Sequence, residues 1–147
     1  MFSVEISTVI RRPVEQVFAF LSDFENWPKW VPGSIEARKT SDGPTGHGTT
    51  WRGVSNVLGR RVESESEVIE FEPNRKITWK YKPGAIQQAK AQATFEPDEG
   101  GTRFTLTLEG DSGGFLKLAE PVFANLAKRQ FEAGLANLKE LMEAHAL

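Results

Sequence analysis

The first residues of the chain alternate between apolar and polar side chains, with the apolar face carried by Phe2, Val4, Ile6, Thr8 and Ile10. This period of two predicts a strand with one covered face. After Pro13 the apolar spacing becomes that of an amphipathic helix, carried by Val14, Val17, Phe18 and Leu21. Residues 23–33 hold two prolines and two tryptophans, which predicts one or two helical turns bent back over an apolar surface.

From about Ile35 to Glu109 the pattern is that of strands separated by turns. Turn-forming clusters stand at residues 41–44, 58–59, 72–74, 82–84 and 97–101, spaced for a meander of neighbouring antiparallel strands. About six further strands are expected. One face of this sheet is predicted to be apolar. The other carries alternating charges, interpreted as a solvated outer face, at Arg61, Glu63, Glu65 and Glu67.

The last part of the chain is predicted to be a long helix, near Pro121 to Ala144, because apolar residues recur there at helical spacing. An antiparallel sheet with one apolar face needs a cover, and this helix is the only long amphipathic element available. The expected fold class is α+β: a curved antiparallel sheet of about seven strands wrapped around a long C-terminal helix, with short helices after strand one. No linker or internal repeat divides the chain, so residues 1–147 are expected to form a single domain.

The predicted inner face mixes large aromatic residues with small ones. Trp51, Trp79 and Tyr81 share that face with glycine, serine and alanine positions on at least three strands. Small side chains opposite large ones either interdigitate or leave a hole, and their distribution favours a hole. An empty cavity of ~300 Å³, the low end for ligand sites, would cost about 7 kcal/mol at ~24 cal/mol per Å³. Typical domains keep only ~5–15 kcal/mol of net stability, so a cavity of that size implies a guest molecule.

A family resemblance is carried by fold patterns spread over nearly the whole chain. They are Pro13 to Phe18 leading to Trp27-Pro28-Lys29-Trp30, the run from Val68 to Trp79 with Glu72-Pro73 and Ile77-Thr78-Trp79, and Leu138-Lys139. On these stretches the sequence resembles the START-related (SRPBCC-like) lipid-transfer superfamily, specifically its polyketide cyclase/dehydrase and lipid-transport group. The resemblance implies a helix-grip fold whose cavity binds an apolar or aromatic small molecule. It implies no fixed set of catalytic residues, and no cofactor is expected.

The expected function is binding of a hydrophobic or aromatic small molecule, lipid-like or polyketide-like, between the sheet and the C-terminal helix. Two alternatives stay open. The first is an enzyme of the cyclase or dehydratase type, which needs ionisable groups converging inside the cavity. The second is an interaction module resembling the co-chaperone members, which needs an exposed apolar patch on the outer face of the sheet. The residues decide neither whether a reaction is catalysed nor the ligand, the pathway and the oligomeric state.

The candidate ligand-binding residues come from aromatic positions, small inner-face positions and the C-terminal helix. Aromatic rings with an N–H or O–H grip a planar apolar ligand and fix its orientation. Gln87 and Gln130 are polar residues beside apolar stripes, so each needs a hydrogen-bond partner if buried. The full set is Trp30, Trp51, Ser64, Ser66, Trp79, Tyr81, Gln87, Ala89, Ala91, Phe104, Leu106, Phe123, Leu126, Ala127, Gln130 and Phe131.

Charge and composition exclude several other classes of function. The 18 basic and 20 acidic residues give a net charge of -2, which leaves no positive surplus to hold a nucleic acid. There is no cysteine, so disulfides, thiolate nucleophiles and cysteine metal sites are excluded. No stretch approaches the ~20 apolar residues of a membrane span, and the first residues lack the pattern of a signal peptide. We therefore expect a cytoplasmic protein without integral membrane association.

Two motifs that look like active-site elements are interpreted as structural. Residues 110–114 spell GDSGG, the string around the nucleophile of trypsin-like proteases. Those enzymes need a two-barrel body that brings a histidine and an aspartate to the serine, and this chain is too short for one. Asp111 or Ser112 is expected to cap a helix instead. The two histidines, His47 and His145, lack metal-ligand spacing, so no metal site is expected.

Overall fold

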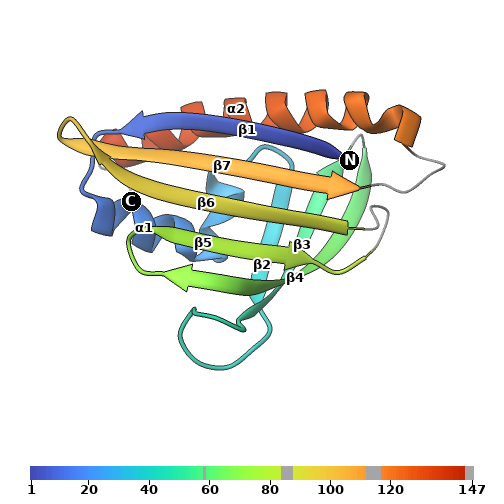
Figure 1. The fold of residues 1–147 in the computed structure, drawn as a ribbon, viewed down its shortest axis with the longest axis horizontal. Helices are drawn as coiled ribbons and strands as arrows, with labels where there is room; N and C mark the ends of the chain where they lie inside the picture. Colours follow the sequence, from blue (N-terminus) through green and yellow to red (C-terminus); the bar gives the residue numbers. More distant parts are fainter. Residues whose placement is uncertain (58, 84–87, 112–116, 145–147) are drawn as a thin grey trace.

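A curved sheet of seven antiparallel strands forms the body of the molecule in the residues that the structure describes, 1–57, 59–83, 88–111 and 117–144 (Figure 1). The structure is a computed structural model. The strands lie in the order β1-β7-β6-β5-β4-β3-β2. They are β1 (Phe2–Ile10), β2 (Ser34–Lys39), β3 (Thr50–Val57), β4 (Arg60–Glu72), β5 (Lys76–Tyr81), β6 (Gln88–Asp98) and β7 (Gly101–Asp111). The prediction of an α+β fold with about seven strands is confirmed.

Helical segments follow the first strand and the last strand of the chain. They are α1 (Val14–Ser22), the 3-10 helices η1 (Phe24–Lys29) and η2 (Lys117–Ala119), and the long helix α2 (Glu120–Glu143). α1 begins directly after Pro13, whose ring fixes φ at a helix-compatible -58°. η1 is capped by Asp23, whose side chain accepts a hydrogen bond from the backbone N–H of Glu25 at 3.1 Å. α1 and η1 are the short helices expected after the first strand.

Helix α2 runs along β1 (Figure 1), and its C-terminal half packs into the core. Leu135, Leu138 and Met142 are the buried apolar residues of that half. Gly134 allows a close approach to Trp30, because a Cβ at Gly134 would lie only 3.1 Å from the indole ring. The sheet and the long C-terminal helix together make the helix-grip arrangement. No helix within the described ranges is both long and apolar enough to cross a membrane.

An aromatic cluster fills the middle of the concave side of the sheet. Ala91 and Ala93 are buried against this part of the core, opposite Trp79 and Ile77 in the register of β5 and β6. The small residues therefore interdigitate with large ones there. The cluster is a chain of ring contacts with centroids 4.8–6.5 Å apart, formed by Phe18, Phe24, Trp27, Trp30, Trp51, Phe71, Trp79, Phe95, Phe104 and Phe131.

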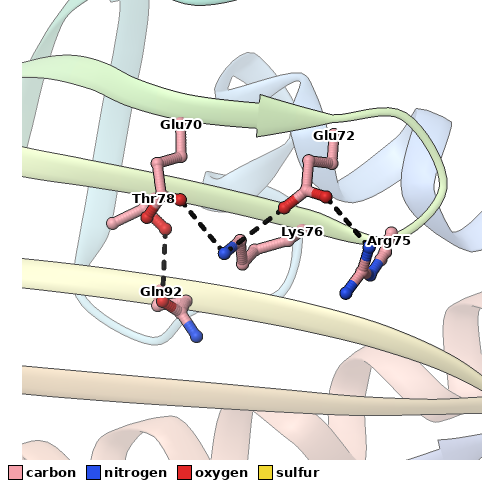
Figure 2. Close-up of polar contacts among 6 residues, drawn as sticks. All are labelled: Glu70, Glu72, Arg75, Lys76, Thr78 and Gln92. Carbon is pink, nitrogen blue, oxygen red and sulfur yellow. Dashed lines mark hydrogen bonds and ion pairs between the residues drawn. The ribbon is translucent and has the colours of Figure 1, made fainter.

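The outer face of the sheet is polar and carries ion pairs, as the alternating charges predicted. Nζ of Lys76 lies 3.0 Å from a carboxylate oxygen of Glu70 and 3.3 Å from one of Glu72. The Lys76 ammonium lowers the pKa of Glu70 by hydrogen bonding, and Glu70 in turn raises the pKa of Lys76. Figure 2 shows this network across β4, β5 and β6, formed by Glu70, Glu72, Arg75, Lys76, Thr78 and Gln92.

Candidate functional site

One end of the sheet is open because β4 is longer than its neighbour β5. β4 pairs with β5 from Glu72 to Ser66, opposite Tyr81, which is the last residue of β5. Residues 60–65 continue β4 beyond that point and pair with β3. No described strand lies between this part of β4 and β6, so side chains have to fill the space.

A cavity of about 480 Å³, called here the large cavity, occupies this open end. Its volume falls within the range of small-molecule sites, ~300–1,000 Å³. Its wall combines apolar residues with a rim of charged ones. The lining residues are Phe2, Arg52, Val62, Glu63, Ser64, Glu65, Tyr81, Lys82, Pro83, Ala89 and Leu108.

A second cavity of about 100 Å³, the small cavity, adjoins the first, since Arg52, Ser64 and Tyr81 line both. Aromatic rings and serine hydroxyls dominate its wall. The lining residues are Phe24, Trp27, Ser34, Glu36, Ala37, Trp51, Arg52, Gly53, Ser55, Ser64, Ser66, Trp79 and Tyr81.

Strand register explains why space remains at these positions. Residues directly opposite one another share a face of the sheet, and one such row runs through Trp51, Ser66, Tyr81, Ala89, Gly110 and Phe2. The ring of Phe2 covers Gly110, where a Cβ would lie 2.6 Å from the ring. Trp51 and Tyr81 are two strands apart, about 10 Å at the usual strand spacing, with only a serine between them. The small cavity lies beside this interval.

The aromatic residues of the site carry hydrogen-bond donors. Nε1 of Trp79 donates to Oη of Tyr81 at 3.1 Å, whereas Nε1 of Trp51 is buried without a partner in the described part of the chain. Burial of Tyr81 raises the pKa of its hydroxyl above the ordinary value, and the hydrogen bond from Trp79 opposes this effect only in part. Tyr81 therefore carries its proton at neutral pH and can donate a hydrogen bond.

The charged residues at the rim of the large cavity are paired with one another. Arg52 lies 2.6 Å from Glu63, and Lys82 lies 3.3 Å from Glu65. All four side chains are exposed by two fifths or more, so each pair contributes little to stability. Because the two pairs cancel in charge, the rim offers no net charge to a charged ligand.

Six of the candidate residues named from the sequence line these cavities, and all six belong to strands. Ser64 and Tyr81 line both cavities. Ala89 lines the large one, and Trp51, Ser66 and Trp79 line the small one.

Four other candidates, three in the sheet and one directly after η1, lie in the packed core outside the lining of both cavities. Trp30, Ala91, Phe104 and Leu106 are each at most 3% exposed. The aromatic cluster occupies the space that the alanine strand leaves at Ala91.

The candidates on the C-terminal helix also lie outside the lining of these two cavities. Ala127 and Phe131 pack against the core, Phe123 is half-buried, and Leu126 is 37% exposed. The side-chain amide of Gln130 donates to the backbone oxygen of Pro32. This bond supplies the partner that the sequence called for and ties α2 to the segment before β2.

Some sequence-based expectations fall outside the described residues. They concern Gln87, the cap at Ser112 and His145. Asp111 ends β7, and His47 is exposed in the connection between β2 and β3. No group of three or more histidine, aspartate or glutamate side chains comes together in the described part of the chain in a way that could hold a metal ion.

Several lining residues of the large cavity are not among the candidates predicted from the sequence. Phe2, Val62 and Leu108 supply apolar wall to the large cavity. All three fit the alternation expected of an inner face, so periodicity alone placed them on the correct side. The signal that could have selected them is the unequal length of the predicted strands on either side of residues 72–75, which leaves β4 without a β5 partner near Val62.

Comparison with known proteins identifies the family. Residues 1–143 match the family described as polyketide cyclase / dehydrase and lipid transport. Since the match covers nearly the whole sequence, the chain belongs to this family, as the resemblance indicated.

Individual proteins share sequence or fold with this chain. An uncharacterized protein of Mycobacterium tuberculosis, Rv2574, is 31% identical over 136 residues, which cover 88% of this chain and 78% of that protein. A START superfamily protein from Mycobacterium smegmatis has the same fold, with a TM-score of 0.82, 17% identity and 97% of each chain covered. The di-domain ARO/CYC StfQ from the steffimycin biosynthetic pathway matches with a TM-score of 0.79 and 14% identity, over 98% of this chain and 51% of that one.

Proposed function

We propose that this protein binds an uncharged apolar or aromatic small molecule in the large cavity. The observation that carries the proposal is the open end of the sheet. There β4 extends past the end of β5, and a cavity of about 480 Å³ remains. Phe2, Val62 and Leu108 offer apolar surface there, and burying such surface is favourable by ~25 cal/mol per Å². Membership of a family described in part by lipid transport supports the same function.

Binding is favoured over catalysis by the positions of the ionisable groups. A cyclase or dehydratase needs acids and bases that converge inside the cavity. In the described lining, the carboxylates of Glu63 and Glu65 lie at the rim and are paired with Arg52 and Lys82. The exposed carboxylate of Glu36 borders the small cavity, and burial of Tyr81 favours its neutral form.

Binding is also favoured over a co-chaperone-like interaction module. Such a module needs an apolar patch on the outer face of the sheet. The described outer face of β4 and β5 instead carries ion pairs, including those of Lys76 with Glu70 and Glu72 (Figure 2).

The test is titration of the purified protein with N-phenylnaphthylamine, an uncharged dye that fluoresces in apolar surroundings. We expect saturable binding, and we expect Ala89→Phe to weaken it about tenfold or more because the new ring enters the large cavity. Ala136→Phe makes the same change at an exposed position of α2 and is the matched control. Circular dichroism checks that both variants fold. Equal dye binding by both folded variants would contradict the proposal, as would the absence of binding by the parent protein.

A further inference from the structure

Trp51 carries a hydrogen-bond donor that the protein itself leaves unused. The residue is 3% exposed, and its Nε1 is buried with no partner among the described residues. An indole N–H can only donate, and a buried donor without an acceptor is unfavourable and rare. Trp51 lines the small cavity, so an acceptor that enters this space comes close to the indole, and a small shift of the ring or its neighbours would bring Nε1 into contact with it.

Tyr81 supplies a second donor to the same space. Its oxygen accepts a hydrogen bond from Nε1 of Trp79 at 3.1 Å. A hydroxyl that accepts in this way keeps its own proton to donate, so Trp79 is a positioning residue that directs the Tyr81 proton elsewhere. Trp51 and Tyr81 stand two strands apart in one row, with Ser66 between them.

The remaining polar groups of the small cavity favour a neutral acceptor. The hydroxyls of Ser64 and Ser66 can donate or accept, so they can pair with a donor or an acceptor of the ligand. The guanidinium of Arg52 is already engaged by Glu63 at 2.6 Å, and the carboxylate of Glu36 would repel an anion. A ligand carboxylate would thus lose its hydration without gaining a free cation.

We propose that Trp51 and Tyr81 donate hydrogen bonds to a carbonyl oxygen of the ligand, which makes its class an uncharged aromatic carbonyl compound. The aromatic body lies in the large cavity, and the carbonyl group points into the small one. This inference rests on the proposed function, since it specifies the ligand of the same site.

The test compares two compounds of nearly the same shape, methyl naphthyl ketone and isopropylnaphthalene, as competitors of N-phenylnaphthylamine. The parent protein should bind the ketone about tenfold more tightly, as two hydrogen bonds of ordinary net strength allow. Trp51→Phe should remove most of this preference, measured as the ratio of the two affinities. Trp30→Phe is the matched control. It also removes a buried indole N–H without a partner, but Trp30 lies outside both cavities, so the preference should remain.

A second measurement reads the hydrogen bond directly. The infrared carbonyl stretch of bound methyl naphthyl ketone should lie at lower frequency in the parent protein than in Trp51→Phe. If Trp51→Phe does not fold, Tyr81→Phe carries the same comparison, with a smaller loss of preference and a smaller frequency change. Equal affinity of the parent protein for both compounds would overturn this inference and leave the proposed function standing. Failure of both compounds to displace the dye would also overturn this inference, whereas the proposed function fails only if the dye itself does not bind or binds equally to folded Ala89→Phe and Ala136→Phe.

Discussion

Nε1 of Trp79 donates a hydrogen bond to Oη of Tyr81 at 3.1 Å, between side chains two positions apart on β5. Residues i and i+2 of a strand point to the same face, so both side chains reach the concave side of the sheet. The bond satisfies an indole that is 2% exposed, and it orients the only tyrosine of the chain at the wall shared by both cavities.

Tyr81→Phe should destabilise the protein by ~1–3 kcal/mol, because it leaves the Trp79 donor buried without an acceptor. Urea denaturation at neutral pH measures the change. Trp79→Phe and the double variant complete a cycle in which the two substitutions should be coupled. Strictly additive effects would show that the hydrogen bond contributes nothing to stability.

Tyr81 should titrate above the ordinary pKa of a tyrosine in the folded protein. Burial raises the pKa of its hydroxyl. A group whose pKa is higher in the folded state stabilises the fold at pH values below its unfolded pKa. That contribution is lost as the pH rises through the folded value. Because Tyr81 is the only tyrosine, the ultraviolet absorbance of tyrosinate reports it alone.

The hydrogen bond from Trp79 works in the opposite direction and lowers the pKa of Tyr81. Trp79→Phe should therefore move the folded-state midpoint further upward. A midpoint equal to that of the urea-unfolded chain would disprove the effect of burial.

Ala91→Leu should destabilise the protein by ~1–3 kcal/mol, since Ala91 is 3% exposed and stands between Trp79 and Leu108 in the sheet register. Ala89→Leu is the matched substitution two positions away on the same face. It points into the large cavity and should cost less. Thermal unfolding of the two variants gives the comparison, and equal losses would mean that the space beside Ala89 is not available to a side chain.

Glu70→Gln should reduce stability at neutral pH by a small amount that disappears in acid. The hydrogen bond from Lys76 lowers the pKa of Glu70, so the ionised carboxylate stabilises the fold above its unfolded pKa. This contribution is lost as the pH falls through the folded value. The urea midpoints of both proteins, followed from neutral to acid pH, should converge. Added salt should also reduce the difference at neutral pH, because the pair is exposed, and an undiminished difference in acid would refute the assignment.

The elements of the fold were predictable because each depends on a local pattern. Alternation placed Phe2 and Ile10 on one face of β1, and the change of period after Pro13 marked α1. The charges at Glu63 and Glu65 were correctly assigned to an exposed position. Such patterns follow from the geometry of a single strand or helix and need no partner to be recognised.

The location of the cavities was predictable only in part. Periodicity selected the face that carries Trp51, Ser66, Tyr81 and Ala89, and these residues do line the cavities. It gave the same weight to Ala91, which the aromatic cluster covers. A small side chain leaves space only where no distant ring fills it, and that depends on contacts between residues far apart in sequence.

By itself, the sequence determined the class of fold, the family and the polarity of each face, since these follow from the spacing of apolar residues, turns and charges. Tertiary structure alone decided that a cavity remains where β4 extends past the end of β5, that the aromatic cluster closes the middle of the concave side, and that the Trp51 indole N–H has no partner among the described residues. The physical reason is that register and packing are set by the whole set of neighbours at once. The alternation of side chains within one strand does not indicate which ring packs against that strand in the folded protein.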